Sequence, residues 1–196
     1  MKRIACLVLA CCLLVPAFVQ SARAQANNPK VVLETSMGKI LVECFADKAP
    51  KTVDNFLQYV REGKYDGTIF HRVISGFMIQ GGGFTPSMQR VQTHQPIANE
   101  ARLDVPNNRG TLAMARTNEP HSATNQFFIN LKDNDFLNFT SATRNGYGYC
   151  VFGKVLDGMN IVDRIASVPT QSAGHYRDVP TTPVVITKAY VMGDAK

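Results

Sequence analysis

The chain contains no tryptophan and only four histidines, and it lacks the common motifs of hydrolytic, redox and nucleotide-binding enzymes. The histidines, at positions 71, 94, 121 and 175, do not show metal-ligand spacing. The triple glycine at 81–83 has neither the Lys-Ser/Thr pair of a phosphate loop nor the spacing of a dinucleotide fingerprint. No G-x-S-x-G elbow is present. The sequence therefore predicts an activity without a metal, a cofactor or a covalent intermediate.

Long apolar runs are missing except at the N-terminus. There, Lys2 and Arg3 precede an apolar stretch from Ile4 to Val19, and Ala22-Arg23-Ala24 follows as a cleavage signal. These are the three parts of a secretory signal peptide, and the stretch is too short for a stable membrane span. We therefore predict that residues 1–24 are cleaved, that residues 25–196 form one domain, and that this domain has no membrane contact.

Cysteine becomes scarce once the leader is removed, because only Cys44 and Cys150 lie beyond residue 24. In an oxidising compartment these two can form a disulfide. The sequence does not place their Cα atoms within bonding range, however, so two buried thiols are the other interpretation.

Charge of either sign is also modest. The chain carries 21 Lys and Arg against 15 Asp and Glu, a formal net charge of +6, and three of the basic residues lie in the leader. Nucleic-acid binding usually requires a clustered basic face and a stronger excess of positive charge. The composition therefore predicts a mildly basic surface and no nucleic-acid partner.

Short strand-like segments dominate the chain after residue 30, because β-branched and aromatic residues alternate with turn residues. The predicted strands are 31–35, 39–45, 68–74, 77–80, 111–115, 126–130, 150–156 and 184–192. Amphipathic patterns predict two helices, from Pro50 to Gly63 and over 158–167, and residues 85–110 read as a long surface loop. Without a βα rhythm, this count predicts a mainly β fold, a closed eight-stranded antiparallel barrel capped by two helices.

The most distinctive stretch surrounds Arg72, where two predicted strands are joined by a tight turn. Period-2 alternation places Arg72 on one face with Phe70 and Ile74, and in the second strand it groups Met78 with Gln80. We therefore expect one guanidinium, one amide and several apolar side chains to converge on a small area.

Four blocks of the sequence, in this order, resemble the signature segments of the cyclophilin-type peptidyl-prolyl isomerases. They are Phe70-His71-Arg72-Val73-Ile74-Ser75-Gly76-Phe77-Met78-Ile79-Gln80-Gly81-Gly82-Gly83-Phe84, Gly110-Thr111-Leu112-Ala113-Met114-Ala115, Asn125-Gln126-Phe127-Phe128-Ile129 and Val151-Phe152-Gly153-Lys154-Val155. The resemblance implies the same barrel, an isomerase acting on proline-containing polypeptides without a cofactor, and a monomer. In detail the chain is most similar to the periplasmic branch of Gram-negative bacteria, which implies a periplasmic location.

An arginine among apolar side chains suits this chemistry. The X-Pro bond resists rotation because nitrogen donates its lone pair into the carbonyl, which gives a barrier of about 20 kcal/mol. Twisting the bond localises that lone pair, so a donor aimed at it binds the twisted state more tightly than the planar one. Arg72 is the candidate donor because its guanidinium stays protonated and offers several N–H groups.

The resemblance also implies the other site residues, with Gln80 as the catalytic partner of Arg72. The substrate-binding residues would line the proline pocket or hold the peptide backbone, and they are Phe77, Met78, Ala115, Arg116, Gln126, Phe128, Phe136, Leu137 and Tyr149. We interpret the neighbouring Phe127 as plain core.

Three of these positions depart from the pattern of the best-known eukaryotic members. Phe136 replaces a tryptophan, so an indole N–H that the cyclosporin class of ligand uses is missing, and we predict weak or no cyclosporin binding. Tyr149 replaces a histidine and Arg116 replaces an asparagine, which leaves Arg72 in place and changes the surroundings of the substrate.

Two other functions are compatible with the same residues. The first is a non-catalytic proline-peptide binding module or holdase chaperone, although binding alone does not need a charge beside the rotating nitrogen. The second is a barrel that holds a small apolar ligand. A barrel this rich in Phe, Ile and Val is expected to be filled by its own side chains, which argues against the second function.

Overall fold

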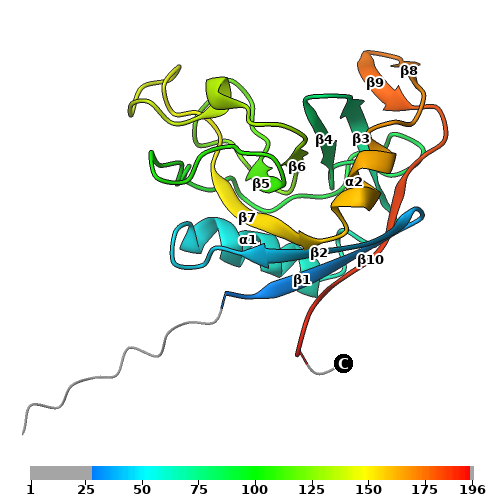
Figure 1. The fold of residues 1–196 in the computed structure, drawn as a ribbon, viewed down its shortest axis with the longest axis horizontal. Helices are drawn as coiled ribbons and strands as arrows, with labels where there is room; N and C mark the ends of the chain where they lie inside the picture. The colour runs from blue at the N-terminus through cyan, green and yellow to red at the C-terminus, as the bar shows by residue number, and fades with distance from the viewer. Residues whose placement is uncertain (1–27, 195–196) are drawn as a thin grey trace, which may run out of the picture.

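Eight strands close into an antiparallel barrel in the computed structural model, which describes residues 28–194 (Figure 1). The barrel strands are β1 (Lys30–Thr35), β2 (Gly38–Cys44), β3 (Thr68–Ile74), β4 (Met78–Gly81), β5 (Thr111–Met114), β6 (Phe127–Asn130), β7 (Val151–Asp157) and β10 (Val185–Val191). Their order around the barrel is β1-β10-β3-β4-β6-β5-β7-β2. The predicted fold class is confirmed, whereas the predicted leader lies outside the described residues.

Helices α1 (Pro50–Arg61) and α2 (Met159–Ile165) add their apolar faces to the core of this barrel. In α1, Pro50 occupies the first turn, and Val53, Phe56, Leu57 and Val60 are buried at the predicted i, i+3, i+4 and i+7 spacing. A helix of this length is marginal alone, so its stability comes from this packing.

The interior of the barrel is filled by aromatic rings. Phe127 is fully buried, and its ring packs edge-on against Phe56 and Tyr65, each with ring centroids 5.5 Å apart, and against Phe70 at 6.3 Å. Edge-to-face pairs of this kind add to the free energy gained from burial alone. Since the interior is occupied by its own side chains, a small-ligand function of the barrel is not supported, and Phe127 belongs to the core.

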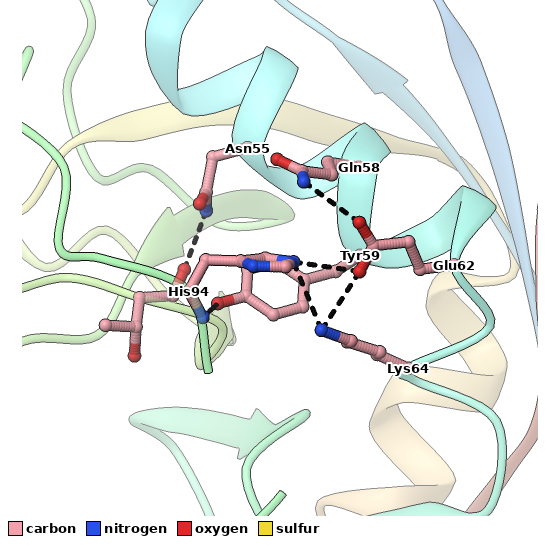
Figure 2. Close-up of polar contacts among 7 residues, drawn as sticks. Asn55, Gln58, Tyr59, Glu62, Lys64 and His94 are labelled. Atoms are coloured by element: carbon pink, nitrogen blue, oxygen red, sulfur yellow. Dashed lines mark hydrogen bonds and ion pairs between the residues drawn. The ribbon is translucent and has the colours of Figure 1, made fainter. Parts of the chain in front are cut away.

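The predicted loop over 85–110 lies along helix α1, and hydrogen bonds attach it near the start and near the end of this helix. Near the start of α1, Glu100 Oε2 accepts hydrogen bonds from the N–H and the hydroxyl of Thr52, both at 2.8 Å. Near its end, the His94 N–H donates to the Tyr59 hydroxyl at 2.7 Å, and His94 Nε2 lies 2.8 Å from Glu62 Oε2 (Figure 2). The loop therefore satisfies the free N–H groups at the helix start, which Ala49 leaves uncapped.

Glu62 is the acceptor at the centre of the cluster in Figure 2. Hydrogen bonds from Gln58, Lys64 and His94 lower its pKa from 4.5 to about 2, because each donor favours the ionised carboxylate. Lys64 Nζ lies 3.0 Å from Glu62 Oε2 and 3.2 Å from His94 Nε2. These histidine and lysine side chains therefore hold the loop against the helix.

A bulge changes the alternation expected around Arg72. The register between β3 and β4 shifts between Phe70 and Arg72, so that Phe70 pairs with Gly81 and Arg72 with Gln80. As a result Phe70 points into the barrel core and is fully buried, while Arg72 is exposed on the other face. The predicted grouping of Phe70 with Arg72 is therefore wrong.

A small hairpin was not expected from the sequence. Strands β8 (Thr170–Ala173) and β9 (Tyr176–Pro180) form a separate two-stranded sheet whose β9 lies beside β3 (Figure 1). A short 3₁₀ helix, η1 (Asp135–Leu137), is the other additional element. Across residues 28–194, no helix has the length and apolar character needed to cross a bilayer.

The two cysteines of the barrel are free and buried. Burial raises the pKa of the Cys44 thiol to about 12 and that of the Cys150 thiol to about 11. Of the two interpretations from the sequence, the structure has the pair of buried thiols rather than the disulfide. Thiols with such high pKa values contain little thiolate and react slowly.

Candidate active site

A small cavity of about 110 Å³ opens on the outer face of the barrel, where β3, β4, β5 and β6 meet. It brings together nine of the eleven residues named from the sequence, namely Arg72, Phe77, Met78, Gln80, Ala115, Arg116, Phe128, Leu137 and Tyr149. The remaining two, Gln126 and Phe136, lie at its margins. The cavity therefore combines apolar walls with two arginines and one glutamine.

Arg72 projects from β3 at the mouth of this cavity. Its side chain is 45% exposed, and Nε lies 3.9 Å from Asp178 Oδ2 on β9. At that distance and exposure the ion pair is weak. The guanidinium therefore keeps most of its N–H groups available while it shares the cavity with Met78 and Phe128.

Two glutamines lie beside Arg72, namely Gln80, which pairs with it across strands β3 and β4, and Gln126, which directly precedes β6. Gln80 Nε2 donates a hydrogen bond to Gln126 Oε1 at 2.9 Å. Gln126 lies directly over Gly83, where a Cβ atom would come within 2.5 Å of the Gln126 side chain. The last glycine of the triple-glycine stretch is therefore required for the position of Gln126.

The apolar wall is formed by Phe128 on β6 together with Met78 and Leu137. Phe128 packs edge-on against Tyr149 with ring centroids 5.6 Å apart, and the Arg116 guanidinium lies 4.6 Å from the centroid of the Tyr149 ring. These contacts fix the position of three side chains at the cavity edge. A wall of this kind suits an apolar ring such as that of proline.

The main chain after β5 forms the edge expected to receive a peptide. The Ala115 N–H donates to the Gln126 carbonyl at 2.9 Å, so this donor is used within the fold. A peptide would therefore meet the Ala115 carbonyl and the main chain of Arg116. The predicted recognition edge at Ala115 and Arg116 therefore offers a peptide one main-chain donor fewer, because the Ala115 N–H is already paired.

Phe136 and Phe77 form the opposite rim. Their rings stack with centroids 5.6 Å apart, and Phe136 is 72% exposed. Buried asparagines hold this rim in place, because Asn134 Nδ2 donates to the Phe77 carbonyl at 3.0 Å and Asn107 Nδ2 donates to the Leu137 carbonyl at 3.1 Å. The sequence showed only an Asn-rich turn here, and it did not indicate that these amides support the cavity.

The residues that sequence reasoning missed lie beside Arg72, in a second groove. Arg90 and the hairpin residues His175, Tyr176, Arg177 and Asp178 line it together with part of the cavity wall. A strand-turn-strand pattern around Gly174 is the signal that predicts such a hairpin. Its position next to Arg72 depends on the packing of β9 against β3, which no local pattern indicates.

His71 lies immediately behind Arg72 and is buried, with 4% of its surface exposed. Its ring packs against Phe84 with centroids 4.6 Å apart, and Nδ1 has no hydrogen-bond partner within residues 28–194. Removal from water disfavours the charged imidazolium and lowers the pKa of His71 from 6.5 to about 4. The imidazole is therefore neutral at physiological pH.

This depressed pKa predicts a loss of stability in acid. The unfolded chain binds a proton at His71 more readily than the folded one between pH 6.5 and about 4, so the free energy of unfolding falls as the pH falls through this window. The loss from this group is roughly 3 kcal/mol. Urea unfolding of wild type and His71→Gln at several pH values measures it, and the variant should show a flatter dependence. Parallel curves for the two proteins would contradict the assignment.

Depressions elsewhere on the described residues differ from this cavity in their lining. A larger depression, of about 1240 Å³, lies by α1, β1 and β10, and four of its charged residues form the ion pairs Lys39–Glu34 and Arg61–Asp194. Within the same residues, no group of three or more His, Cys, Asp or Glu side chains is arranged to hold a metal ion.

Comparisons with known proteins point to a single family. Residues 30–191 match the family described as cyclophilin type peptidyl-prolyl cis-trans isomerase/CLD. The chain is 61% identical to peptidyl-prolyl cis-trans isomerase cyp18 of Streptomyces antibioticus over 83% of its own length and 98% of that protein. It is 57% identical to peptidyl-prolyl cis-trans isomerase B of Escherichia coli strain K12 over 82% of its own length and 98% of that protein.

A solved structure shares the fold. The crystal structure of a cyclophilin type peptidyl-prolyl cis-trans isomerase from Cryptosporidium parvum, in the presence of the dipeptide Ala-Pro, aligns with a TM-score of 0.69 and 27% identity. The alignment covers 84% of this chain and 99% of that one.

Proposed function

The chain belongs to the cyclophilin-type peptidyl-prolyl cis-trans isomerase family, and on this basis we propose that it isomerises X-Pro bonds of secreted polypeptides in the periplasm. Isomerase activity follows from the family and from relatives named for this activity. The substrate is a proline-containing peptide, as in the relative crystallised in the presence of Ala-Pro. Uncatalysed isomerisation takes tens of seconds, so such an enzyme removes a slow step in folding.

We propose Arg72 as the residue that stabilises the twisted amide. The observation that carries this role is that Arg72 lines one small cavity together with the apolar side chains of Met78 and Phe128. A proline ring seated against those side chains brings its nitrogen to the side of the guanidinium. An N–H donated from the guanidinium to the localised lone pair lowers the barrier.

The remaining residues are proposed to hold the substrate. Gln80 and Gln126 offer amide groups to the peptide backbone, and the main chain of Ala115 and Arg116 offers a short extended edge. Gripping the chain on both sides of the rotating bond supplies the part of the acceleration that one donor does not. A competing role as a pure binding module is less well supported, since it gives the exposed Arg72 no function.

The proposed function also includes a periplasmic location. It rests on the basic start, apolar stretch and Ala22-Arg23-Ala24 signal of the sequence. Expression of the full chain in a Gram-negative host, followed by periplasmic fractionation and intact-mass analysis, tests it. A cytoplasmic protein that retains residues 1–24 would contradict it. Size-exclusion chromatography of the same sample tests the proposal that the cleaved enzyme acts as a monomer.

The exposed Phe136 predicts weak cyclosporin binding. Phenylalanine lacks the indole N–H, and one such hydrogen bond contributes about 1 kcal/mol. Cyclosporin should therefore inhibit the purified protein only weakly, and Phe136→Trp should tighten cyclosporin binding about fivefold. Isothermal titration of both proteins measures this. Nanomolar inhibition of wild type would show that the indole is not needed here.

A further inference from the structure

A groove of about 590 Å³ continues from the proline cavity along the outer face of β3 and β9. Arg72, Gln80 and Arg116 line both spaces, so the two are joined. Four of the charged side chains that line the groove are arginines, and Asp178 is the one carboxylate among its lining residues. The chain as a whole has 21 basic and 15 acidic residues, so positive charge is concentrated in this groove.

Most of the arginines outside the groove are paired with a carboxylate, and the exception among the described residues is Arg164, which donates to the Met37 carbonyl. Outside it, four arginines each form an ion pair within 3 Å of a carboxylate, in the pairs Arg61–Asp194, Arg102–Asp104, Arg109–Asp163 and Arg144–Glu119. Among the described residues 28–194, Asp178 is the one residue whose carboxylate lies within 4 Å of a groove arginine. Its Oδ2 is 3.9 Å from Arg72 Nε. Arg90, Arg116 and Arg177 therefore present guanidinium groups that the fold itself does not neutralise.

The groove is built on packed rings. Phe84 forms its floor, with the Tyr176 ring edge-on at 5.0 Å and the Arg90 guanidinium 5.6 Å from its centroid. Arg116 is held by donating from Nε to the Gly148 carbonyl at 2.9 Å and from Nη1 to the Thr117 carbonyl at 2.9 Å. These contacts restrict the side chains, so that less conformational entropy is lost when they bind a ligand.

We propose that this groove selects prolyl substrates that carry aspartate or glutamate within two residues of the proline. The inference rests on the proposed function, because it assumes that a proline occupies the adjoining cavity. An extended peptide advances about 3.3 Å per residue, so the residues next to a bound proline must pass along the groove. A carboxylate there meets arginines whose planar N–H groups match its geometry.

An acidic peptide fits the groove better than another polyanion does. The positive charge is confined to a concave strip that is continuous with an apolar cavity sized for one ring. A nucleic acid or an anionic membrane would need a broader basic face than these four arginines provide. The substrate that uses both spaces together is therefore a peptide with a proline and a nearby acid.

Matched peptides test the proposal. NMR exchange spectroscopy gives kcat/KM for the sequence Xaa-Ala-Pro-Ala-Xaa with Xaa as Glu, Gln or Lys. We expect the Glu peptide to be favoured over Gln about tenfold at low salt, through KM rather than kcat, and the preference to fall below about threefold in about 0.5 M NaCl. Equal rates for Glu and Gln would overturn the acidic preference and leave isomerase activity intact. No acceleration of any peptide would instead overturn the proposed function.

Two double variants test whether the preference for the Glu peptide arises from the arginines of the groove. Arg90→Gln with Arg177→Gln removes two groove charges and should reduce the Glu preference to about twofold while the Gln peptide reacts as in wild type. Lys51→Gln with Lys188→Gln removes the same charge from exposed positions outside the groove and should keep the full preference. An equal loss in both variants would mean a net-charge effect and overturn the proposal. So would a single-stranded oligonucleotide that displaces the Glu peptide at equal concentration.

Discussion

Replacing Arg72 by alanine is expected to lower kcat/KM for a neutral Ala-Pro peptide by about 10²–10³, measured by NMR exchange spectroscopy. The guanidinium is proposed to act on the twisted amide alone, so the loss should fall on kcat while peptide affinity changes little. Arg72→Lys keeps the charge without the planar set of donors, so its kcat/KM should lie between those of wild type and Arg72→Ala.

Arg102→Ala provides the control for this result. Arg102 is an exposed arginine that pairs with Asp104 in the long loop, and it lines neither the cavity nor the adjoining groove. It should leave kcat/KM unchanged. If Arg72→Ala and wild type accelerated exchange equally, Arg72 would have no catalytic role, and a binding module would become the better description of the site.

Replacing Phe127 by alanine is expected to cost about 3–5 kcal/mol of the free energy of unfolding. Phe127 is fully buried among three aromatic rings, so truncation removes its transfer free energy and leaves a cavity that rigid neighbours cannot fill. A domain of this kind has only about 5–15 kcal/mol in total. Urea unfolding should therefore show a much lower midpoint with an unchanged slope.

Phe136→Ala is the matched control, because it removes the same side chain from a position that is 72% exposed. Its stacking on Phe77 is solvent-facing, and the cost should stay within about 0.5 kcal/mol. Similar losses for the two variants would mean that Phe127 is not the centre of the core. The comparison also separates stability from function, since only Phe136 lies at the rim of the cavity.

The barrel was predictable from the sequence because each strand carries its own local signal. Turn residues bound every β-branched run, and the helix from Pro50 shows its buried stripe at 3.6-residue spacing. Phe70 was misplaced because a bulge after it changes which residue faces the core, and a bulge has no signal in a simple alternation. The cavity residues were named by their motif and not by periodicity.

The groove beside the cavity was not predictable in the same way. Arg90 lies in the long loop and Arg177 in a hairpin almost ninety residues later, so the sequence gives no reason to place them together. Packing of β9 against β3 brings Arg177 into the groove beside Arg72, and the bridge between Phe84 and Arg90 brings Arg90 there. Local patterns indicate which residues form strands. A cluster of charged side chains from segments far apart in the sequence is determined only by the tertiary packing of the barrel.

The pairing of the first barrel strand with the last has a consequence for biosynthesis. β1 lies between β2 and β10, and the Met192 N–H donates to the Lys30 carbonyl at 2.8 Å (Figure 1). Until residue 191 has emerged from the ribosome or a translocation channel, β1 and β3 have no β10 to pair with, and the nascent sheet carries two open edges. Such edges recruit other extended chains, so a folding catalyst of this design itself depends on protection while it is being made.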